Sequence, residues 1–216
     1  MDLERELIPA ADKNSRRLMI VMHGLGDSMD GYRWLPGELG FPWLNYLLLN
    51  APDPYFGGYS WFDFPGDPTP GVERSYRLLA ALLDELRTGG HPTEQTLLFG
   101  FSQGCLMTWE TGLRYPHLLA GGIGISGFMH QPEQLLKKRS AVALRQRFLI
   151  THGTLDPLIP FAAARRQVQA IIKAGVQVTW HEFEKAHAIA GEAELAVIRD
   201  FVRRCFEPPV ETSRNA

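Results

Sequence analysis

The sequence predicts an α/β fold in which a mostly parallel central sheet is covered by helices on both faces. Six short runs rich in Val, Ile, Leu and Phe, most of them bounded by Gly, Pro or Asn, are typical of strands buried on both faces. The predicted strands are Leu18–Met22, Leu44–Leu49, Thr96–Phe101, Ile123–Ile125, Phe148–Thr151 and Val176–Phe183. Because strands alternate with helical segments, we expect binding sites at the carboxyl ends of the strands.

The segments between these runs have the apolar spacing of amphipathic helices. In Val72–Arg87 leucines recur at three- and four-residue spacings, and two glycines follow as a stop signal. Phe161–Lys173 begins directly after a proline, and Glu192–Phe206 carries apolar residues along one side. A further helix is expected over Cys105–Arg114. Helices and strands therefore alternate along most of the chain.

The length of 216 residues predicts one domain, residues 1–216, with a single core. Apolar residues make up 45% and charged residues 21%, which is ordinary for a globular protein. We find no repeat and no linker, and because this length leaves little room for a separate cap we expect no large cap domain. The loop Asn50–Gly71 is rich in Pro, Gly and aromatic residues, and loops of this length usually have a function. Residues 207–216 are expected to form a frayed polar tail.

Charge, cysteine content and hydropathy exclude several classes of protein. A net charge of −2 provides no basic face for nucleic acid. The N-terminus lacks the pattern of a secretory signal and no stretch approaches about 20 apolar residues, so we expect no stable membrane insertion and a cytoplasmic location. Cys105 and Cys205 are far apart, which predicts reduced thiols and neither a disulfide nor a metal site.

The segment Gly-Phe-Ser-Gln-Gly at residues 100–104 is the strongest indication of chemistry. It lies between a predicted strand and a predicted helix, which is the setting of a nucleophile elbow. Glycine on both sides allows the tight turn, and the N-terminus of the helix favours the anion that forms on attack. Ser102 is therefore the predicted nucleophile. In the alternative interpretation the glycines and the serine only mark a turn.

Two further residues follow Ser102 in the chain order Ser, Asp, His that such a site requires. Asp156 stands just beyond the fifth predicted strand, where a carboxylate could reach an imidazole; alternatively it is a solvated loop residue that starts a turn before Pro157. His187 lies in the turn after the last predicted strand and is the expected general base. Its competitor, His181, falls inside that strand and would point to one face of the sheet.

The loop His-Gly-Leu-Gly-Asp at residues 23–27 follows the first predicted strand and can supply an oxyanion hole. Its glycines allow the backbone to approach a substrate closely. We expect the backbone N–H groups of Leu25 and Gln103 to be the donors, and His23 to form hydrogen bonds beside the site. A Gly-x-Gly loop could also cradle a phosphate, although this one lacks the third glycine of a dinucleotide site and the lysine of a P-loop.

Together these segments resemble the carboxylesterase, lysophospholipase and acyl-protein thioesterase family of small α/β-hydrolases. The similarity extends from about Arg17 to Phe206 and includes Trp-Phe-Asp at 61–63, Ser-Gly at 126–127 and His-Gly-Thr-Leu-Asp-Pro at 152–157. The resemblance implies an α/β-hydrolase fold and the same set of site residues: Ser102, Asp156, His187, Leu25 and Gln103. The chain departs from the family pattern at Cys105, where members often carry a second glycine. It also has Ala186-His187-Ala188 where Gly-His-Ser or Gly-His-Glu is common.

The reaction expected of this site is hydrolysis of a small carboxylic ester of short to medium acyl chain through an acyl-enzyme, with no cofactor or metal. Acyl-protein thioesterase or lysophospholipase activity is the alternative, because the three residues act on the carbonyl and do not select the leaving group. A non-catalytic ligand-binding homologue would predict an incomplete triad. A peptidase of this fold usually needs an added domain.

Apolar residues of the loops are expected to form the wall of an acyl site. The candidates are Tyr59, Trp61, Phe62, Phe128, Met129 and Leu158, with Trp61 as the first choice. The alternative for each is that it packs its loop onto the sheet. Because exposed apolar loop residues could equally serve an interface between two copies, a homodimer is left open.

Overall fold

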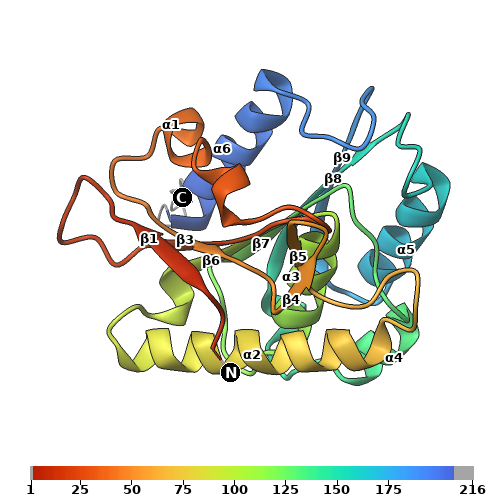
Figure 1. The fold of residues 1–216 in the computed structure, drawn as a ribbon, viewed down its shortest axis with the longest axis horizontal. Coiled ribbons are helices and arrows are strands. Elements are labelled where there is room, and N and C mark those ends of the chain that lie inside the picture. Colours follow the sequence, from red (N-terminus) through yellow and green to blue (C-terminus); the bar gives the residue numbers. More distant parts are fainter. Residues whose placement is uncertain (1, 207–216) are drawn as a thin grey trace, which may run out of the picture.

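A seven-stranded sheet forms the centre of the computed structural model, which describes residues 2–206 (Figure 1). Its strands are β1 (Arg5–Ile8), β2 (Leu18–Met22), β3 (Asn45–Leu49), β6 (Thr96–Phe101), β7 (Gly121–Ile125), β8 (Arg147–Gly153) and β9 (Gln177–Phe183). They lie in the order β1-β3-β2-β6-β7-β8-β9. Only β1 runs antiparallel to its neighbour, so the carboxyl ends of the other strands reach one edge of the sheet.

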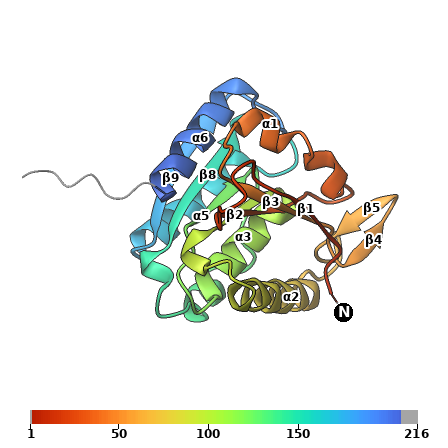
Figure 2. The ribbon, with the colours of Figure 1, turned by 90° about the vertical axis from the view of Figure 1, so that its left-hand side faces the viewer.

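Helices cover both faces of this sheet, as Figure 2 shows. They are α1 (Leu35–Leu39), α2 (Thr69–Thr88), α3 (Gln103–Arg114), α4 (Pro132–Lys137), α5 (Phe161–Lys173) and α6 (Glu192–Phe206). α1 and α6 pack on one face, and α2, α3 and α5 pack on the other. A hairpin of β4 (Asp53–Tyr55) and β5 (Gly58–Ser60) projects from the loop before α2.

Every residue of β2 is apolar because helices cover this strand on both faces. Met19 and Val21 pack under α1 and α6, whereas Leu18, Ile20 and Met22 pack against α2 and α3. All five side chains are buried, and each contributes about 1.5–3 kcal/mol by leaving water. The sequence of a strand covered on both faces is therefore an unbroken run of apolar residues.

The predicted fold class is confirmed, and no segment of residues 2–206 forms a large cap domain. Every predicted strand and helix is present, with small differences at some ends. The sequence does not predict β1, the β4–β5 hairpin, α1 or α4, because each of these elements is only three to six residues long and too short to establish a period. The predicted tail, residues 207–216, lies outside the described residues.

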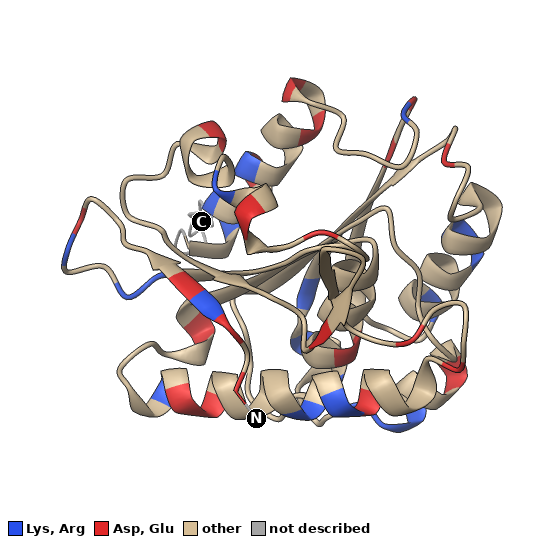
Figure 3. Ribbon diagram, viewed as in Figure 1, with Lys and Arg blue, Asp and Glu red and all other residues tan. Residues whose placement is uncertain are grey.

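Acidic and basic residues are interspersed along the surface elements, as Figure 3 shows for α2 and β1. Within residues 2–206 no helix has the length and hydropathy needed to span a bilayer. The same residues contain no group of His, Cys, Asp and Glu arranged to hold a metal ion. Both cysteines are buried free thiols, and burial raises the pKa of Cys105 to about 12 and that of Cys205 to about 11.

Candidate active site

Ser102 stands at the tight turn between β6 and α3 in a strained backbone conformation. Its φ of 53° and ψ of −112° lie outside the regions that non-glycine residues prefer, at a cost on the order of 1–3 kcal/mol. A Cβ at Gly100 would lie 2.0 Å from the carbonyl oxygen of Gly104, and a Cβ at Gly104 would lie 2.1 Å from that of Met22. Both positions therefore require glycine, because a Cβ at either one would collide with a backbone carbonyl oxygen.

The side chains of Ser102, His187 and Asp156 form one hydrogen-bonded chain at the carboxyl edge of the sheet. Ser102 Oγ donates to His187 Nε2 over 2.9 Å, and His187 Nδ1 donates to Asp156 Oδ2 over 2.8 Å. The Asp156 side chain is fully buried, whereas the imidazole keeps 13% of its surface exposed. The carboxylate fixes the imidazole tautomer whose Nε2 can accept the serine proton.

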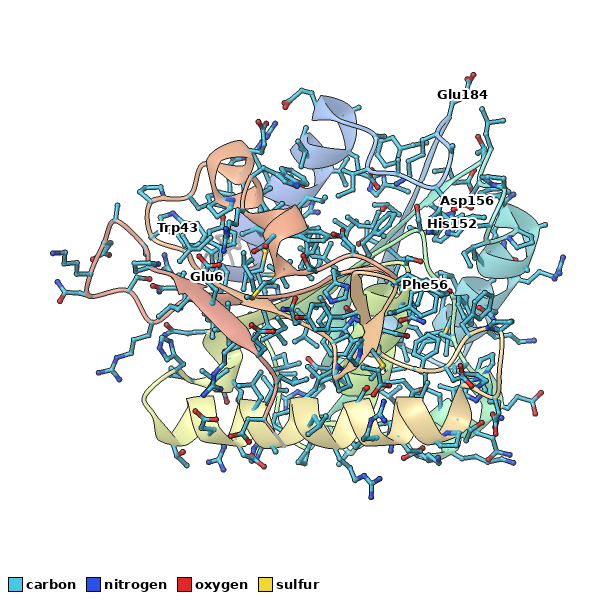
Figure 4. The ribbon with its side chains drawn as sticks, viewed as in Figure 1. Glu6, Trp43, Phe56, His152, Asp156 and Glu184 are labelled. Carbon is cyan, nitrogen blue, oxygen red and sulfur yellow. The ribbon has the colours of Figure 1, made fainter. Side chains whose placement is uncertain are left out.

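The loop after β8 holds Asp156 by backbone donors. The amides of Leu158 and Ile159 each donate to Oδ1 over 2.9 Å. Burial raises the pKa of Asp156, but these amides and His187 outweigh burial, so the pKa lies below its ordinary value. His152 Nε2 donates to the Ile159 carbonyl over 3.0 Å and closes the same loop, and burial lowers the pKa of His152. Figure 4 shows His152 and Asp156 side by side at this end of β8.

The loop after β2 brings Leu25 to the cavity that contains Ser102. The strand β5 fixes this loop by two backbone hydrogen bonds of 2.9 Å, from Gly26 N–H to the Tyr59 carbonyl and from Tyr59 N–H to the Asp27 carbonyl. The approach is so close that a Cβ at Gly58 would lie 2.2 Å from the Gly26 carbonyl oxygen. In the described part of the chain we find no hydrogen bond that occupies the Leu25 amide.

Gln103 contributes through its backbone and through its side chain. As the first residue of α3, its amide has no acceptor within the helix and can donate to a substrate oxygen. Its buried side chain accepts a hydrogen bond from Trp61 N–H over 2.9 Å and donates to the Phe62 carbonyl over 3.1 Å. The Ser60 hydroxyl also reaches Gln103 Oε1, at 3.3 Å. The Gln103 side chain thus holds residues 60–62 against the elbow.

A cavity of about 500 Å³ opens beside Ser102, within the size range of small-molecule sites. Its apolar lining residues are Phe62, Phe64, Phe101, Phe128, Pro157, Leu158 and Ile159, together with Leu25. Among residues 2–206, no lysine or arginine belongs to its lining. This lining suits an acyl chain, and it lacks the cations that would favour a phosphate.

Three of the predicted wall residues, Phe62, Phe128 and Leu158, line this cavity, and three others, Tyr59, Trp61 and Met129, do not. Trp61 is fully buried against α2, and its indole N–H donates to the His23 carbonyl over 3.0 Å. Met129 is buried in the cluster between α3 and α5. The Tyr59 hydroxyl bonds Glu4 at 3.2 Å. The structure thus corrects the prediction for these three residues, which pack their loops onto the sheet.

Four apolar lining residues are not predicted from the sequence: Phe64, Phe101, Pro157 and Ile159. Phe101 occupies the variable position before Ser102, and its ring centroid lies 5.0 Å from that of His187. Pro157 and Ile159 follow Asp156 on the loop that orients it. These three residues could have been predicted as lining residues because they lie close to Ser102 or Asp156 in the sequence. For Phe64 the only indication in the sequence is its place in the aromatic loop.

The other candidate histidines lie outside the hydrogen-bonded chain. His181 lines a separate groove between β9 and α6, beside Ala196. His23 Nε2 accepts a hydrogen bond from Ala51 N–H over 3.1 Å, and burial lowers the pKa of His23. His23 therefore has a hydrogen-bonding position beside the site.

Known proteins share this fold and this sequence pattern. The family described as phospholipase/carboxylesterase matches residues 3–206. Acyl-protein thioesterase 1 of Schizosaccharomyces pombe is 29% identical over 196 residues, which cover 84% of this chain and 88% of that protein. A probable carboxylesterase of Arabidopsis thaliana, SOBER1-like, is 27% identical and covers 94% of this chain and 84% of its own length. The crystal structure of esterase PE8 has 29% identity and a TM-score of 0.84, and covers 95% of this chain and 100% of its own.

Proposed function

Because the chain belongs to the phospholipase/carboxylesterase family, we propose that it hydrolyses carboxylic esters of short to medium acyl chain through Ser102, His187 and Asp156. Family membership confirms the enzyme class predicted from the sequence, a serine hydrolase that acts on ester or thioester bonds. The observation that carries the proposal is the continuous hydrogen-bonded chain from Ser102 Oγ to Asp156 beside an apolar cavity.

The first half of the reaction transfers the acyl group to Ser102. His187 Nε2 removes the hydroxyl proton as Oγ attacks the carbonyl carbon, and Asp156 stabilises the imidazolium. The amides of Leu25 and Gln103 donate to the oxyanion, and each donor of this kind is worth about 10²–10³-fold in kcat. The imidazolium then protonates the leaving oxygen or sulfur as the bond to the carbonyl carbon breaks.

The second half releases the acid. His187 takes a proton from a water molecule, which attacks the acyl carbonyl on Ser102 while the same two amides bind the oxyanion. The Ser102 oxygen leaves and recovers its proton from His187. Every step uses side chains and amides of this chain.

The cavity supports a preference for short to medium acyl chains. Its walls are aromatic and aliphatic, but its rim is open: Leu158 is 66% exposed and Phe64 is 51% exposed. A buried methylene contributes about 0.8 kcal/mol. A long chain would extend past these walls into water, where its last methylenes gain little.

Cleavage of a thioester on an acylated protein is the second candidate function. The open rim at Leu158 and Phe64 leaves space for a bulky leaving group. Relatives that cover most of this chain are named acyl-protein thioesterase 1. The open rim would also leave space for the headgroup of a lysophospholipid, which is the leaving group when its acyl ester is cleaved.

Initial rates on two substrate series test the proposal, with Ser102→Ala as the background control. On p-nitrophenyl esters from acetate to palmitate we expect the highest kcat/KM among the short and medium members. A steady increase up to palmitate contradicts the proposed chain length. On S-acylated peptides and lysophospholipids with matched acyl groups, a higher kcat/KM than on the simple ester would favour the second function.

A further inference from the structure

A buried ion pair joins Lys185, two residues before His187, to Glu194, seven residues after it. Lys185 Nζ donates to both carboxylate oxygens of Glu194, over 2.6 and 2.8 Å. The two side chains are 5% and 0% exposed, which is rare for charged groups unless they are paired. Glu194 belongs to the first turn of α6, so the pair joins this helix to the residues just before His187.

Glu194 fixes the His187 segment from both sides. Its carboxylate accepts from the Lys185 ammonium, which precedes His187, and from the backbone N–H of Ala190, which follows it, at 2.5 Å. The Thr151 hydroxyl of β8 donates to the same carboxylate. One side chain therefore attaches both ends of the segment 185–190 to the sheet and to α6.

Lys185 also joins this segment to the loop that carries Asp156. Its carbonyl oxygen accepts from the Leu155 amide over 3.2 Å. The two loops approach so closely that a Cβ at Gly153 would lie 2.2 Å from the same carbonyl oxygen. Figure 4 shows Glu184, the neighbour of Lys185, at the same end of the molecule as Asp156. The backbone of Lys185 thus connects the loop of Asp156, the predicted acid, to the segment of His187, the predicted base.

The residues on either side of His187 cannot hold it by side-chain hydrogen bonds, because both are alanines. His187 lies at the apex of a tight turn closed by a hydrogen bond of 2.9 Å from Ala188 N–H to the Ala186 carbonyl. The place of the imidazole therefore depends on where the two ends of the segment are attached.

We propose that Lys185 and Glu194 are positioning residues, whose ion pair keeps His187 within hydrogen-bond distance of both Ser102 and Asp156. The proposal rests on the proposed function of His187 as general base. A buried ion pair is weak support for stability, because apolar residues of similar volume often serve as well. A displacement of about 1 Å at a reacting group can lower a rate about 100-fold. We therefore expect the pair to affect kcat, through the position of His187, more than it affects stability.

Two single variants test this role. Glu194→Gln keeps the shape and removes the charge, and Lys185→Met keeps the apolar stem and removes the ammonium. At a temperature where each variant is folded, we expect kcat on p-nitrophenyl butyrate to fall about tenfold to hundredfold, with KM within about twofold of wild type. The matched control is Glu110→Gln, which removes a buried carboxylate that pairs with Arg114 over 2.8 Å on α3. The control is expected to lower Tm and to keep kcat.

A double variant, Lys185→Met with Glu194→Met, separates positioning from stability. It removes both charges from the interior, so we expect it to recover most of the Tm that the single variants lose. It also removes the acceptor of Thr151 and Ala190, so kcat is expected to stay low. Recovery of kcat together with Tm would overturn the proposal.

The proton between His187 Nδ1 and Asp156 gives a readout that does not depend on activity. We expect its low-field NMR resonance to be sharp in wild type and in Glu110→Gln, and broadened or lost in Glu194→Gln and Lys185→Met. Wild-type kcat with an unchanged resonance in either folded variant overturns the positioning role. A wild-type chain that shows the resonance, loses it in both variants and hydrolyses no ester would contradict the proposed function while supporting the positioning.

Discussion

The turn at Ser102 and the segment around His187 are held in different ways. Ser102 is fixed by its own backbone, with a positive φ and with glycines on both sides that allow carbonyl groups to approach closely. His187 is fixed by side chains outside its own turn, those of Asp156, Lys185 and Glu194. The first arrangement stores strain, whereas the second depends on buried charge. The two regions should therefore fail for different reasons when they are altered.

Asp156→Asn acts on the side-chain region and has the largest expected effect. The amide removes the negative charge that stabilises the imidazolium and favours the wrong tautomer of His187, so kcat on p-nitrophenyl butyrate is expected to fall about 10⁴-fold. Steady-state kinetics measure the fall in kcat, and a urea unfolding curve checks that the variant is folded. A kcat within tenfold of wild type would show that His187 does not need this carboxylate.

Gly104→Ala acts on the backbone region. Its Cβ would meet the Met22 carbonyl oxygen at 2.1 Å, where only backbone movement can relieve the contact. We expect the free energy of unfolding in urea to fall by more than about 3 kcal/mol. The matched control is Gly37→Ala in α1, where an added Cβ meets nothing within 4 Å; a change within about 1 kcal/mol is expected there. Equal effects at the two positions would contradict the account of the elbow.

Ser102→Gly and Ser102→Ala sharpen the comparison by measuring the strain itself. Both substitutions remove the Ser102 hydroxyl, but only glycine adopts a φ of 53° without cost. We expect the glycine variant to be about 1–2 kcal/mol more stable than the alanine variant in urea unfolding. If alanine were the more stable, the elbow would not be strained.

The pH dependence of stability tests the charge on Asp156. Its pKa is lower in the folded protein than its ordinary value of about 3.9, so its contribution to stability is fully present above that value and is lost as the pH falls through the folded pKa. We therefore expect the difference in Tm between wild type and Asp156→Asn to decrease as the pH is lowered from about 6 to about 3. A difference that grows in that range would have the wrong sign.

The features that the sequence predicts are those imposed by backbone geometry or by burial on two faces. The glycines around Ser102 are required at fixed spacing, and unbroken apolar runs such as that of β2 identify the central strands. The carboxyl ends of the parallel strands β6, β8 and β9 lie at one edge of the sheet, so the residues that follow them, Ser102, Asp156 and His187, can meet. Single-domain organisation, a cytoplasmic location and the oligomeric state stay predictions.

The features that the sequence does not predict depend on which way side chains point. Trp61 has the composition expected of a substrate wall, yet it packs under α2, whereas Phe64 reaches the cavity from the same loop. The ion pair of Lys185 and Glu194 involves residues nine positions apart that meet because α6 turns back over β8. No periodicity or motif marks such contacts, because they arise from tertiary packing.

Labelling with a fluorophosphonate probe tests the central claim most directly, because the probe reacts with an activated serine. We expect one adduct per chain, located on Ser102 by mass spectrometry of the digested protein and absent from Ser102→Ala. Ser28→Ala, on the loop after β2, is expected to label at the wild-type rate. Labelling that persists in Ser102→Ala, or an adduct on another residue of the wild-type chain, would contradict the assignment of Ser102 as the nucleophile.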